Sequence, residues 1–336
     1  MKKHKKYYKF IPIFLGLIII LLIAGLMMWD FSPKKISWGV TFSQEYAEKE
    51  LGLNWRQTYL AILDDLKVSH LRLSAYWNII EPAAGQYDFT DLDWQINEAA
   101  KRNVKIVLAL GRRLPRWPEC HDPDWLKSLN SKEIETQQLA YMQKVVEHYQ
   151  NNQQIIYWQV ENEPFLEYFG QCPALDTAFL KEEIILVKNL TAKPVLVTDS
   201  GELSTWLPIS KVGGDILGTT VYRVVNNKYL GYVRWFLPPA YYYLKAALIR
   251  TFTPIKKIIV AELQTEAWHK ADTNLKIMTV EESFESMDLK QFNQNISFAK
   301  RAGFDEVYLW GAEWWYLLKT EKNFPAYWQE AKKLWP

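Results

Sequence analysis

The chain has 336 residues, which is enough for two average domains or for one (β/α)8 barrel of roughly 250 residues. Its 40 basic and 38 acidic residues leave a formal net charge of only +2, which argues against a nucleic-acid-binding protein. Apolar residues make up 49% of the chain, and among them 16 Trp and 19 Tyr fit either a large packed core or a cleft whose rings stack on sugars.

The first predicted element is a membrane-spanning helix over residues 10–29. This run, FIPIFLGLIIILLIAGLMMW, carries no charge and is long enough as a helix to cross the ~30 Å hydrocarbon layer. Lysines cluster ahead of it, so we expect residues 1–9 to form a cytoplasmic tail and the rest of the chain to lie outside. The alternative is a cleaved signal peptide, but no A-x-A site follows the run. Residues 30–35 are expected to form a linker.

Beyond the linker, short apolar runs alternate with longer amphipathic stretches. Near-continuous apolar strands indicate a parallel sheet covered by helices, and eight of them predict an α/β fold, a closed (β/α)8 TIM barrel over residues 36–336. A doubly wound open sheet is the alternative, but no Gly-rich phosphate turn follows an early strand. The predicted strands are Ile36–Phe42, His70–Tyr76, Val104–Leu110, Ile155–Val160, Pro194–Thr198, Ile216–Tyr222, Ile258–Leu263 and Glu306–Trp310.

The stretches between these strands have helical periodicity. One region differs: Tyr229–Phe252, between the sixth and seventh strands, is rich in aromatic residues and poor in acids. Its ordinary interpretation is the sixth helix with its loop. The alternative is a surface that contacts the membrane or forms a wall of a substrate site. The predicted helices are Trp55–Leu66, Leu92–Arg102, Lys132–Tyr149, Ala178–Leu190 and Leu289–Arg301.

Carboxylates close two of the predicted strands. Glu163 follows the fourth strand, and Glu262 ends the seventh. Barrel enzymes place their chemistry at the carboxyl ends of strands, and these two strands lie across the mouth from each other. A single Glu is more simply explained by ion pairing or helix capping. A converging pair is what cleavage of a glycosidic bond needs: one group protonates the leaving oxygen and the other faces the anomeric carbon.

The run Asn162-Glu163-Pro164 resembles the Asn-Glu-Pro motif of clan A glycoside hydrolases, and Glu262 matches the glutamate that closes the seventh strand in that clan. The resemblance covers residues 36–335, and the stretch Trp77–Phe89 is similar to beta-galactosidase-like and xylanase-like members; the clan also includes cellulase-like members. It implies that Glu163 is the general acid/base and Glu262 the nucleophile of a retaining reaction, whose two carboxyls lie ~5 Å apart.

The same resemblance implies roles for four more residues. Arg72 on the second strand matches the arginine that positions the nucleophile, and Tyr222 matches the tyrosine beside it. Asn162 matches the residue that contacts the sugar 2-hydroxyl. Trp310, which ends the eighth strand, matches the platform under the reacting sugar, although a core aromatic residue is the simpler interpretation.

Three other glutamates are weaker candidates. Glu161 should point away from Glu163 if the strand extends that far, because side chains alternate along a strand. Glu266 is the fallback nucleophile, but it lies beyond the apolar run and is more simply a contact at the rim. Glu81 is expected to be structural.

The loops hold further candidates for substrate contact. Trp117 is a candidate platform for stacking, and so are three other tryptophans. Polar candidates follow the fifth, seventh and eighth strands. The full set is Trp117, Trp125, Trp314, Trp315, Asp199, Glu202, Gln264 and Glu313.

Cys120 and Cys172 follow the third and fourth strands, so both loops should lie on the same rim. Export would favour a disulfide between them, and the alternative is two free thiols. Arg112, Arg113 and Arg116 fit either an anionic sugar substituent or pairing with nearby acids. Five scattered His residues lack ligand spacing, so no metal or other cofactor is predicted.

The sequence therefore predicts a retaining glycoside hydrolase that cleaves an extracytoplasmic glycan by double displacement. Its partners would be an oligo- or polysaccharide substrate and the lipid bilayer, through residues 10–29. The alternatives are a transglycosylase, in which a sugar intercepts the glycosyl-enzyme, and a catalytically inactive carbohydrate-binding barrel at the cell surface.

Overall fold

The computed structural model describes residues 29–335 except Tyr168, Ala271 and Asp272, together with Pro12, Phe14, Gly16, Ala24 and Gly25. The predicted cytoplasmic tail and almost all of the predicted membrane anchor lie outside these residues. Within the part of the chain that is described, no helix is long and apolar enough to cross a bilayer.

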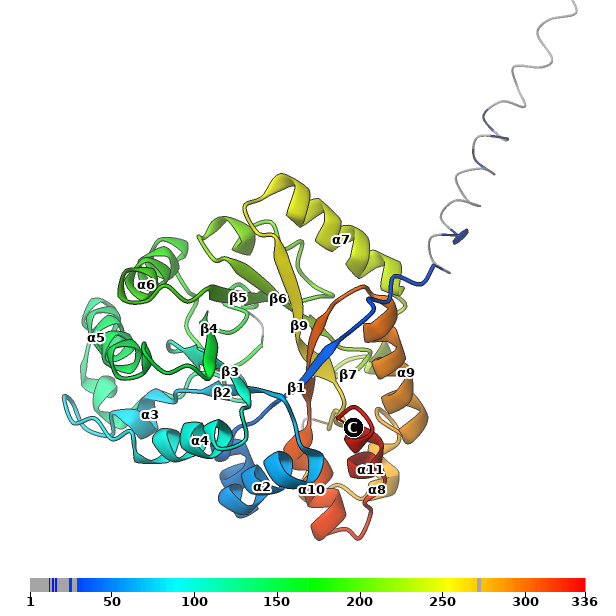
Figure 1. The fold of residues 1–336 in the computed structure, drawn as a ribbon, viewed down its shortest axis with the longest axis horizontal. Helices are drawn as coiled ribbons and strands as arrows, with labels where there is room; N and C mark the ends of the chain where they lie inside the picture. Colours follow the sequence, from blue (N-terminus) through cyan, green and yellow to red (C-terminus); the bar gives the residue numbers. More distant parts are fainter. Residues whose placement is uncertain are drawn as a thin grey trace, which may run out of the picture.

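Eight parallel strands close into a barrel, as predicted (Figure 1). Neighbouring strands follow the order of the chain, and the last one pairs with the first, Ser37 lying opposite Glu306. The open-sheet alternative is therefore wrong. The strands are β1 (Ser37–Thr41), β2 (His70–Ser74), β3 (Lys105–Leu110), β4 (Ile155–Val160), β5 (Val195–Asp199), β6 (Ile216–Val221), β9 (Lys257–Gln264) and β10 (Glu306–Trp310).

Helices surround the barrel (Figure 1). The connection from β5 to β6, which is described throughout, contains only the 3-10 turn η5 (Ile209–Lys211) in place of an α-helix. The larger helices are α2 (Trp55–Ala61) with its π-helical continuation η3 (Ile62–Leu66), α4 (Thr90–Ala100), α5 (Ser131–Tyr149), α6 (Thr177–Leu190), α7 (Pro239–Phe252), α9 (Leu289–Arg301), α10 (Ala312–Thr320) and α11 (Ala326–Lys332).

Side-chain caps fix where several helices begin. Asn130 and Glu133 form a capping box at the start of α5, in which each side chain binds a backbone N–H at the other position. The side chains of Asp176 and Asp288 each accept a hydrogen bond from a backbone N–H in the first turn, of α6 and of α9 respectively. These caps satisfy N–H groups that the first helical turn leaves without partners.

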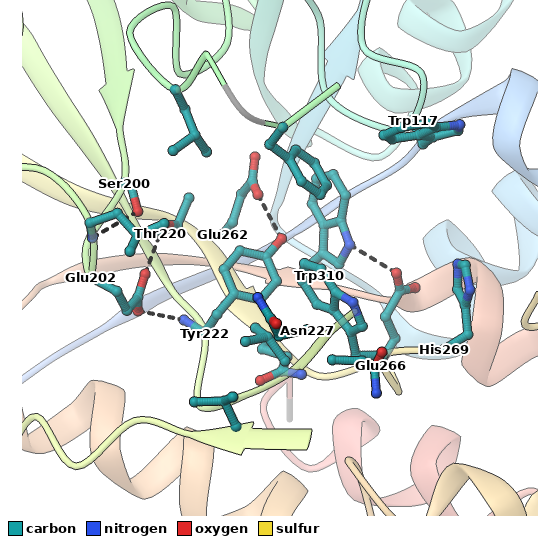
Figure 2. Close-up of a pocket in the computed structure, with 18 of the residues that line it drawn as sticks. Trp117, Ser200, Glu202, Thr220, Tyr222, Asn227, Glu262, Glu266, His269 and Trp310 are labelled. Carbon is teal, nitrogen blue, oxygen red and sulfur yellow. Dashed lines mark hydrogen bonds between the residues drawn. The ribbon is translucent and has the colours of Figure 1, made fainter. Parts of the chain in front are cut away.

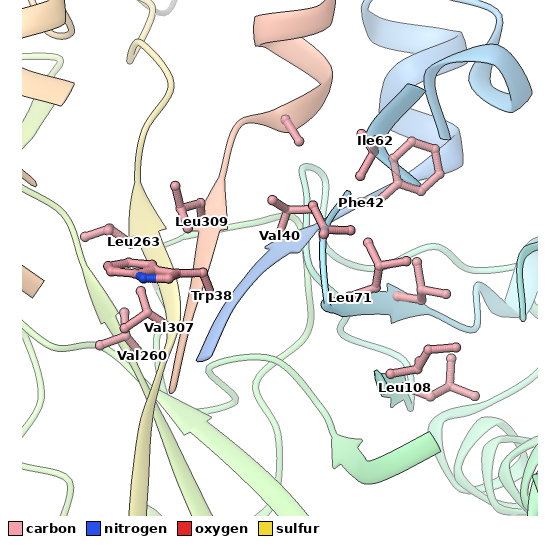
Figure 3. Packing of buried hydrophobic residues seen from close by; sticks show 14 of the residues in the cluster. Trp38, Val40, Phe42, Ile62, Leu71, Leu108, Val260, Leu263, Val307 and Leu309 are labelled. Carbon is pink, nitrogen blue, oxygen red and sulfur yellow. The ribbon is translucent and has the colours of Figure 1, made fainter. Parts of the chain in front are cut away.

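Alternation along the strands produces two apolar layers. One set of side chains, such as Val40, Leu71 and Leu108, points toward the helices and forms the main core (Figure 3). The other set, including Val107 and Ile259, forms a small cluster of its own that fits the barrel interior. The barrel is thus packed, and its chemistry is left to the loops at the ends of the strands.

The aromatic region after the sixth barrel strand combines a hairpin and a helix. Strands β7 (Val224–Asn227) and β8 (Gly231–Arg234) pair antiparallel, and α7 follows them. The helix with its loop, expected from the sequence, is therefore present. The hairpin also contributes to a cavity at the barrel mouth, so part of the region forms a wall of the candidate site.

A disulfide joins Cys120 and Cys172, whose Cα atoms are 5.4 Å apart. It connects the loop after β3 to the loop after β4. Both loops carry residues of the candidate active site, which the disulfide holds together.

Candidate active site

Glu163 lies just beyond β4, where the backbone leaves the strand in an unusual conformation. Glu161 and Glu163 have φ angles of 57° and 42°, in the left-handed region that non-glycine residues rarely adopt. The backbone N–H of Glu163 donates to the hydroxyl of Thr198 on β5 at 2.9 Å. Because β4 ends at Val160, local turns rather than strand alternation direct these two side chains.

A β-bulge in β9 lies next to Glu262. The pairing of β9 shifts register against both β6 and β10 between Val260 and Leu263. Val260 and Leu263 both pack in the main core, and strict alternation would leave only one residue between two such positions. Two residues, Ala261 and Glu262, lie between them, so the bulge adds one residue here. The bulge thereby allows Glu262 to face the barrel mouth, where strict alternation would place it on the same side as Val260.

Arg72 connects three polar residues of the barrel mouth. Its Nη1 donates to Glu262 Oε1 at 2.8 Å, its Nη2 to Asn162 Oδ1 at 2.7 Å, and its Nε to Gln159 Oε1 at 2.7 Å. The guanidinium is completely buried, and a buried charge requires such partners. Arg72 thus holds Glu262 and Asn162 in fixed orientations.

Tyr222 donates its hydroxyl to the second carboxylate oxygen, Glu262 Oε2, at 2.8 Å. Burial, and then the negative charge of Glu262, raise the pKa of Tyr222 well above its usual range. The phenol therefore stays protonated and remains a donor. Glu262 thus accepts a hydrogen bond on each oxygen, from Arg72 on one and from Tyr222 on the other.

Glu163 has a different environment. The polar contact to its carboxyl is from the hydroxyl of Thr220, at 3.4 Å. Burial raises the pKa of Glu163 well above its usual range, and the negative charge of Glu262 raises it further, followed by Glu119 and Asp199. The protonated form of Glu163 is therefore favoured, as a general acid requires.

Glu119 is a third carboxyl of the site, and the sequence did not point to it. It is buried in the loop after β3, receives a hydrogen bond from Arg113 Nε at 2.6 Å and lies 3.5 Å from Asn162 Nδ2. Burial raises the pKa of Glu119 to about 8, against the opposing charge of Arg113. The only sequence feature that could have indicated Glu119 is its position next to Cys120, in a loop without periodicity.

Of these residues, Glu119 and Tyr222 line a cavity of about 560 Å³, whereas Arg72 and Asn162 are not among its lining residues (Figure 2). Both Glu163 and Glu262 line it. Figure 2 shows Tyr222 reaching Glu262 and Trp310 reaching Glu266 within it, and the volume lies in the range of small-molecule sites.

Trp310 belongs to a second polar group in the cavity. Its indole Nε1 donates to Glu266 Oε1 at 2.8 Å, and the guanidinium of Arg116 stacks over its ring at 4.0 Å. Arg116 also pairs with Glu266 and Glu313. Glu266 is thus a partner of Arg116 and Trp310, which matches a rim contact better than a nucleophile.

The structure gives Gln264 and Glu313 supporting positions. Gln264 lines the cavity, but its Oε1 accepts from the backbone N–H groups of Arg223 and Val224, which hold the base of the β7–β8 hairpin. Glu313 is completely buried and accepts from the Ser43 N–H as well as from Arg116. Glu313 therefore orients Arg116 and is not a substrate contact.

The four tryptophans predicted to stack on substrate lie in three different kinds of surroundings. Trp117 is half exposed and lines the cavity, so it can stack on a ligand. Trp125 packs edge-on against Trp77 and donates to the carbonyl of Glu81. Trp314 and Trp315 are buried in the core, where Trp314 packs against Tyr327 and Trp315 against Phe292, so the expectation that they stack on substrate was wrong.

The other acidic candidates also differ in their contacts. Glu161 accepts from the N–H groups of Arg112 and Arg113 at 2.7 Å and from Gln138, so it fixes the loop after β3 and does not face Glu163. Glu81 accepts from the indole of Trp77 and is structural, as predicted. Glu202 lines the cavity and accepts from the Tyr222 N–H at 2.7 Å.

All three arginines of the loop after β3 are paired with acids. Arg112 binds Asp122, Arg113 binds Glu119, and Arg116 binds Glu266 and Glu313. This supports the simpler of the two interpretations. Asp199 likewise accepts from the neighbouring Ser200 N–H at 2.9 Å. Among the described residues, no group of His, Cys, Asp and Glu side chains has the arrangement of a metal site.

Comparison with known proteins finds similarity to glycoside hydrolases. A family model described as Glyco_hydro_42, beta-galactosidase, matches residues 52–183. The curated protein Beta-galactosidase BgaA of Clostridium cellulovorans is 26% identical over 212 residues, covering 57% of this chain and 32% of that protein. The chain thus spans about a third of the length of this relative.

Solved structures share the barrel. A GH5_18 protein from Streptomyces cattleya, solved with GlcNAc, superposes with a TM-score of 0.57 at 11% identity, over 83% of this chain and 71% of that one. A beta-galactosidase from the psychrophilic Marinomonas ef1 has a TM-score of 0.57 at 14% identity, over 82% and 54%. A family 1 β-glucosidase from Thermotoga maritima has a TM-score of 0.52 at 12% identity, over 84% and 89%. The predicted resemblance to clan A glycoside hydrolases is confirmed.

Proposed function

We propose that this protein is a retaining glycoside hydrolase of beta-galactosidase-like specificity. The observation that carries the proposal is the contrast between two carboxyls in one cavity. Glu262 receives hydrogen bonds on both oxygens, whereas burial and nearby negative charge raise the pKa of Glu163. The chemistry of the double displacement requires one ionised and one protonated carboxyl.

In the first step Glu262 attacks the anomeric carbon, and the bond to the leaving oxygen breaks as Glu163 protonates that oxygen. In the second step Glu163, now ionised, takes a proton from water, which attacks the anomeric carbon and releases Glu262. Asn162, held by Arg72, is the residue we assign to the sugar 2-hydroxyl. Trp310 supplies an apolar face beneath the sugar ring.

A pair of matched variants tests the two roles. Glu262→Ala should abolish hydrolysis of an activated aryl glycoside, and azide should restore turnover as the glycosyl azide of inverted configuration. Glu163→Ala should lower kcat/KM for a poor leaving group by about 10²–10⁴-fold, and azide should give the azide of retained configuration. An active Glu262→Ala variant, or the same azide product from both variants, would contradict the assignment.

We also propose that residues 10–29 anchor the barrel on the outer face of the cytoplasmic membrane. The uncharged run and the lysines before it support this topology, and a disulfide is typical of an oxidising compartment. The residues just after the run are packed on the barrel, since Phe31 stacks on Tyr243 of α7 at 3.8 Å. Protease added to intact cells should digest the barrel; protection would contradict the topology.

A further inference from the structure

The cavity has a polar half and an apolar half. The polar half comprises the charged residues around Trp310, among them Arg116, Glu262 and Glu266. The apolar half is formed by the loop after β5 and by the β7–β8 hairpin, through Leu203, Val225, Leu230, Val233 and Trp235, and the turn of the hairpin also brings Asn226, Asn227 and Lys228 to the lining. A sugar ring, with hydroxyls on every side, fits the polar half better than the apolar one.

The position of Glu163 indicates which part of the substrate lies against the apolar half. The proton donor must reach the leaving oxygen, so the leaving group, or aglycone, lies on the Glu163 side of the site. The hydroxyl of Thr220 is 3.4 Å from both Glu163 Oε1 and Glu202 Oε2. Leu203 follows Glu202 in the chain, and the hairpin follows Tyr222, whose N–H binds Glu202. These contacts connect Leu203 and the start of the hairpin to Glu163, so we place the apolar half on the aglycone side.

Two of its side chains are exposed although they are apolar. Leu203 is 54% exposed and Leu230 is 77% exposed, and both line the cavity. Exposed leucines on one wall of a binding cavity lose contact with water only when a ligand covers them, and that gain favours an apolar ligand. A second sugar would leave the hydroxyls that face Leu203 and Leu230 without partners.

From these contacts we propose that the substrate is a glycoside with an apolar aglycone, such as an alkyl or acyl chain, that lies between the loop after β5 and the β7–β8 hairpin. This rests on the proposed glycosidase function and specifies its substrate class. The chain could belong to a glycolipid of a bilayer or to a soluble apolar glycoside; the chemistry of recognition is the same.

The test compares alkyl glycosides of one sugar, from methyl to octyl, below their micellar concentrations. The full-length protein in lipid nanodiscs is used. We expect kcat/KM to rise about threefold for each of the first added methylenes, as their surface leaves water. A flat dependence from methyl to octyl would overturn the proposal. Failure to cleave any glycoside, including activated aryl glycosides, would instead overturn the function on which it rests.

Variants locate the effect. Leu203→Ser and Leu230→Ser should each lower the octyl-to-methyl ratio of kcat/KM several-fold. Leu207→Ser is the matched control, because Leu207 lies in the same loop and is exposed but does not line the cavity. An equal fall in the ratio for Leu207→Ser, or no fall for the other two, would contradict the assigned position of the aglycone.

A second arm identifies the source of the chain. Phosphatidylcholine vesicles containing a galactosyl diacylglycerol serve as the probe. Cleavage of this lipid, together with the octyl preference, would assign the site to bilayer glycolipids. An octyl preference without cleavage in vesicles would assign it to soluble apolar glycosides.

Discussion

At the scale of single residues, Glu163 and Glu262 differ in the side chains that surround their carboxyl groups. Glu262 meets a guanidinium and a phenol, while Glu163 meets one weak hydroxyl donor and lies among other carboxylates. The identities of these residues could be predicted from the sequence, because they end strands and match a known motif. Their neighbour Glu119 belongs to an irregular loop, whose course depends on tertiary contacts that no periodicity encodes.

The charge of Glu262 predicts a change in the pH dependence of the acid. Glu163 must be protonated to act, so activity should fall as pH rises through its raised pKa. Removing the Glu262 charge in Glu262→Gln should lower the pKa of Glu163, which burial still keeps above its ordinary value. Carbon-13 NMR titration of Glu163 in both proteins measures the change. An unchanged or higher pKa in the variant would contradict this coupling.

At the scale of elements, the strands and most helices could be predicted, whereas the bulge in β9 and the β7–β8 hairpin could not. A bulge inserts one residue without altering the apolar pattern of Ile258–Leu263, so alternation alone cannot locate it. The hairpin is stabilised from outside its own sequence, because Gln264 of β9 binds the backbone at its base.

Gln264 is therefore predicted to control the order of the hairpin. Gln264→Leu would leave the N–H groups of Arg223 and Val224 without their acceptor, at a cost of about 1–3 kcal/mol for each buried group. Amide hydrogen exchange over residues 224–234 should accelerate, while exchange in β1–β3 stays unchanged as the internal control. Unaltered exchange in the hairpin would show that other contacts order it.

The disulfide should contribute measurably to stability. Cys120 and Cys172 are separated by 52 positions, and closing such a loop restricts the unfolded chain by about 4 kcal/mol in the chain-entropy model. Reduction should therefore lower the Tm of the barrel, by roughly 5–10 °C for a domain of this size. The Cys120→Ser/Cys172→Ser variant should show the lower Tm and no further response to reductant. Equal Tm values for the oxidised and reduced protein would contradict this contribution.

At the scale of the whole molecule, the alternation of apolar strands and amphipathic helices was sufficient to predict a closed barrel. Closure follows from the number of strands, and it brings the ends of β4 and β9 to one mouth. The cavity between them depends on loops of irregular length. The sequence therefore predicts the reaction better than it predicts the substrate. Of the apolar wall formed by Leu203 and Leu230, the sequence indicated only the part within Tyr229–Phe252, as an alternative interpretation of that region.

The stereochemistry of the first product tests the central claim most directly. Proton NMR can follow the anomeric signal while the wild-type protein hydrolyses an aryl β-glycoside, before mutarotation mixes the two anomers. Double displacement through Glu262 predicts that the β-anomer appears first, since two inversions restore the starting configuration. An α-anomer as the first product would contradict the account, because it would mean that water attacks directly and Glu262 is not the nucleophile.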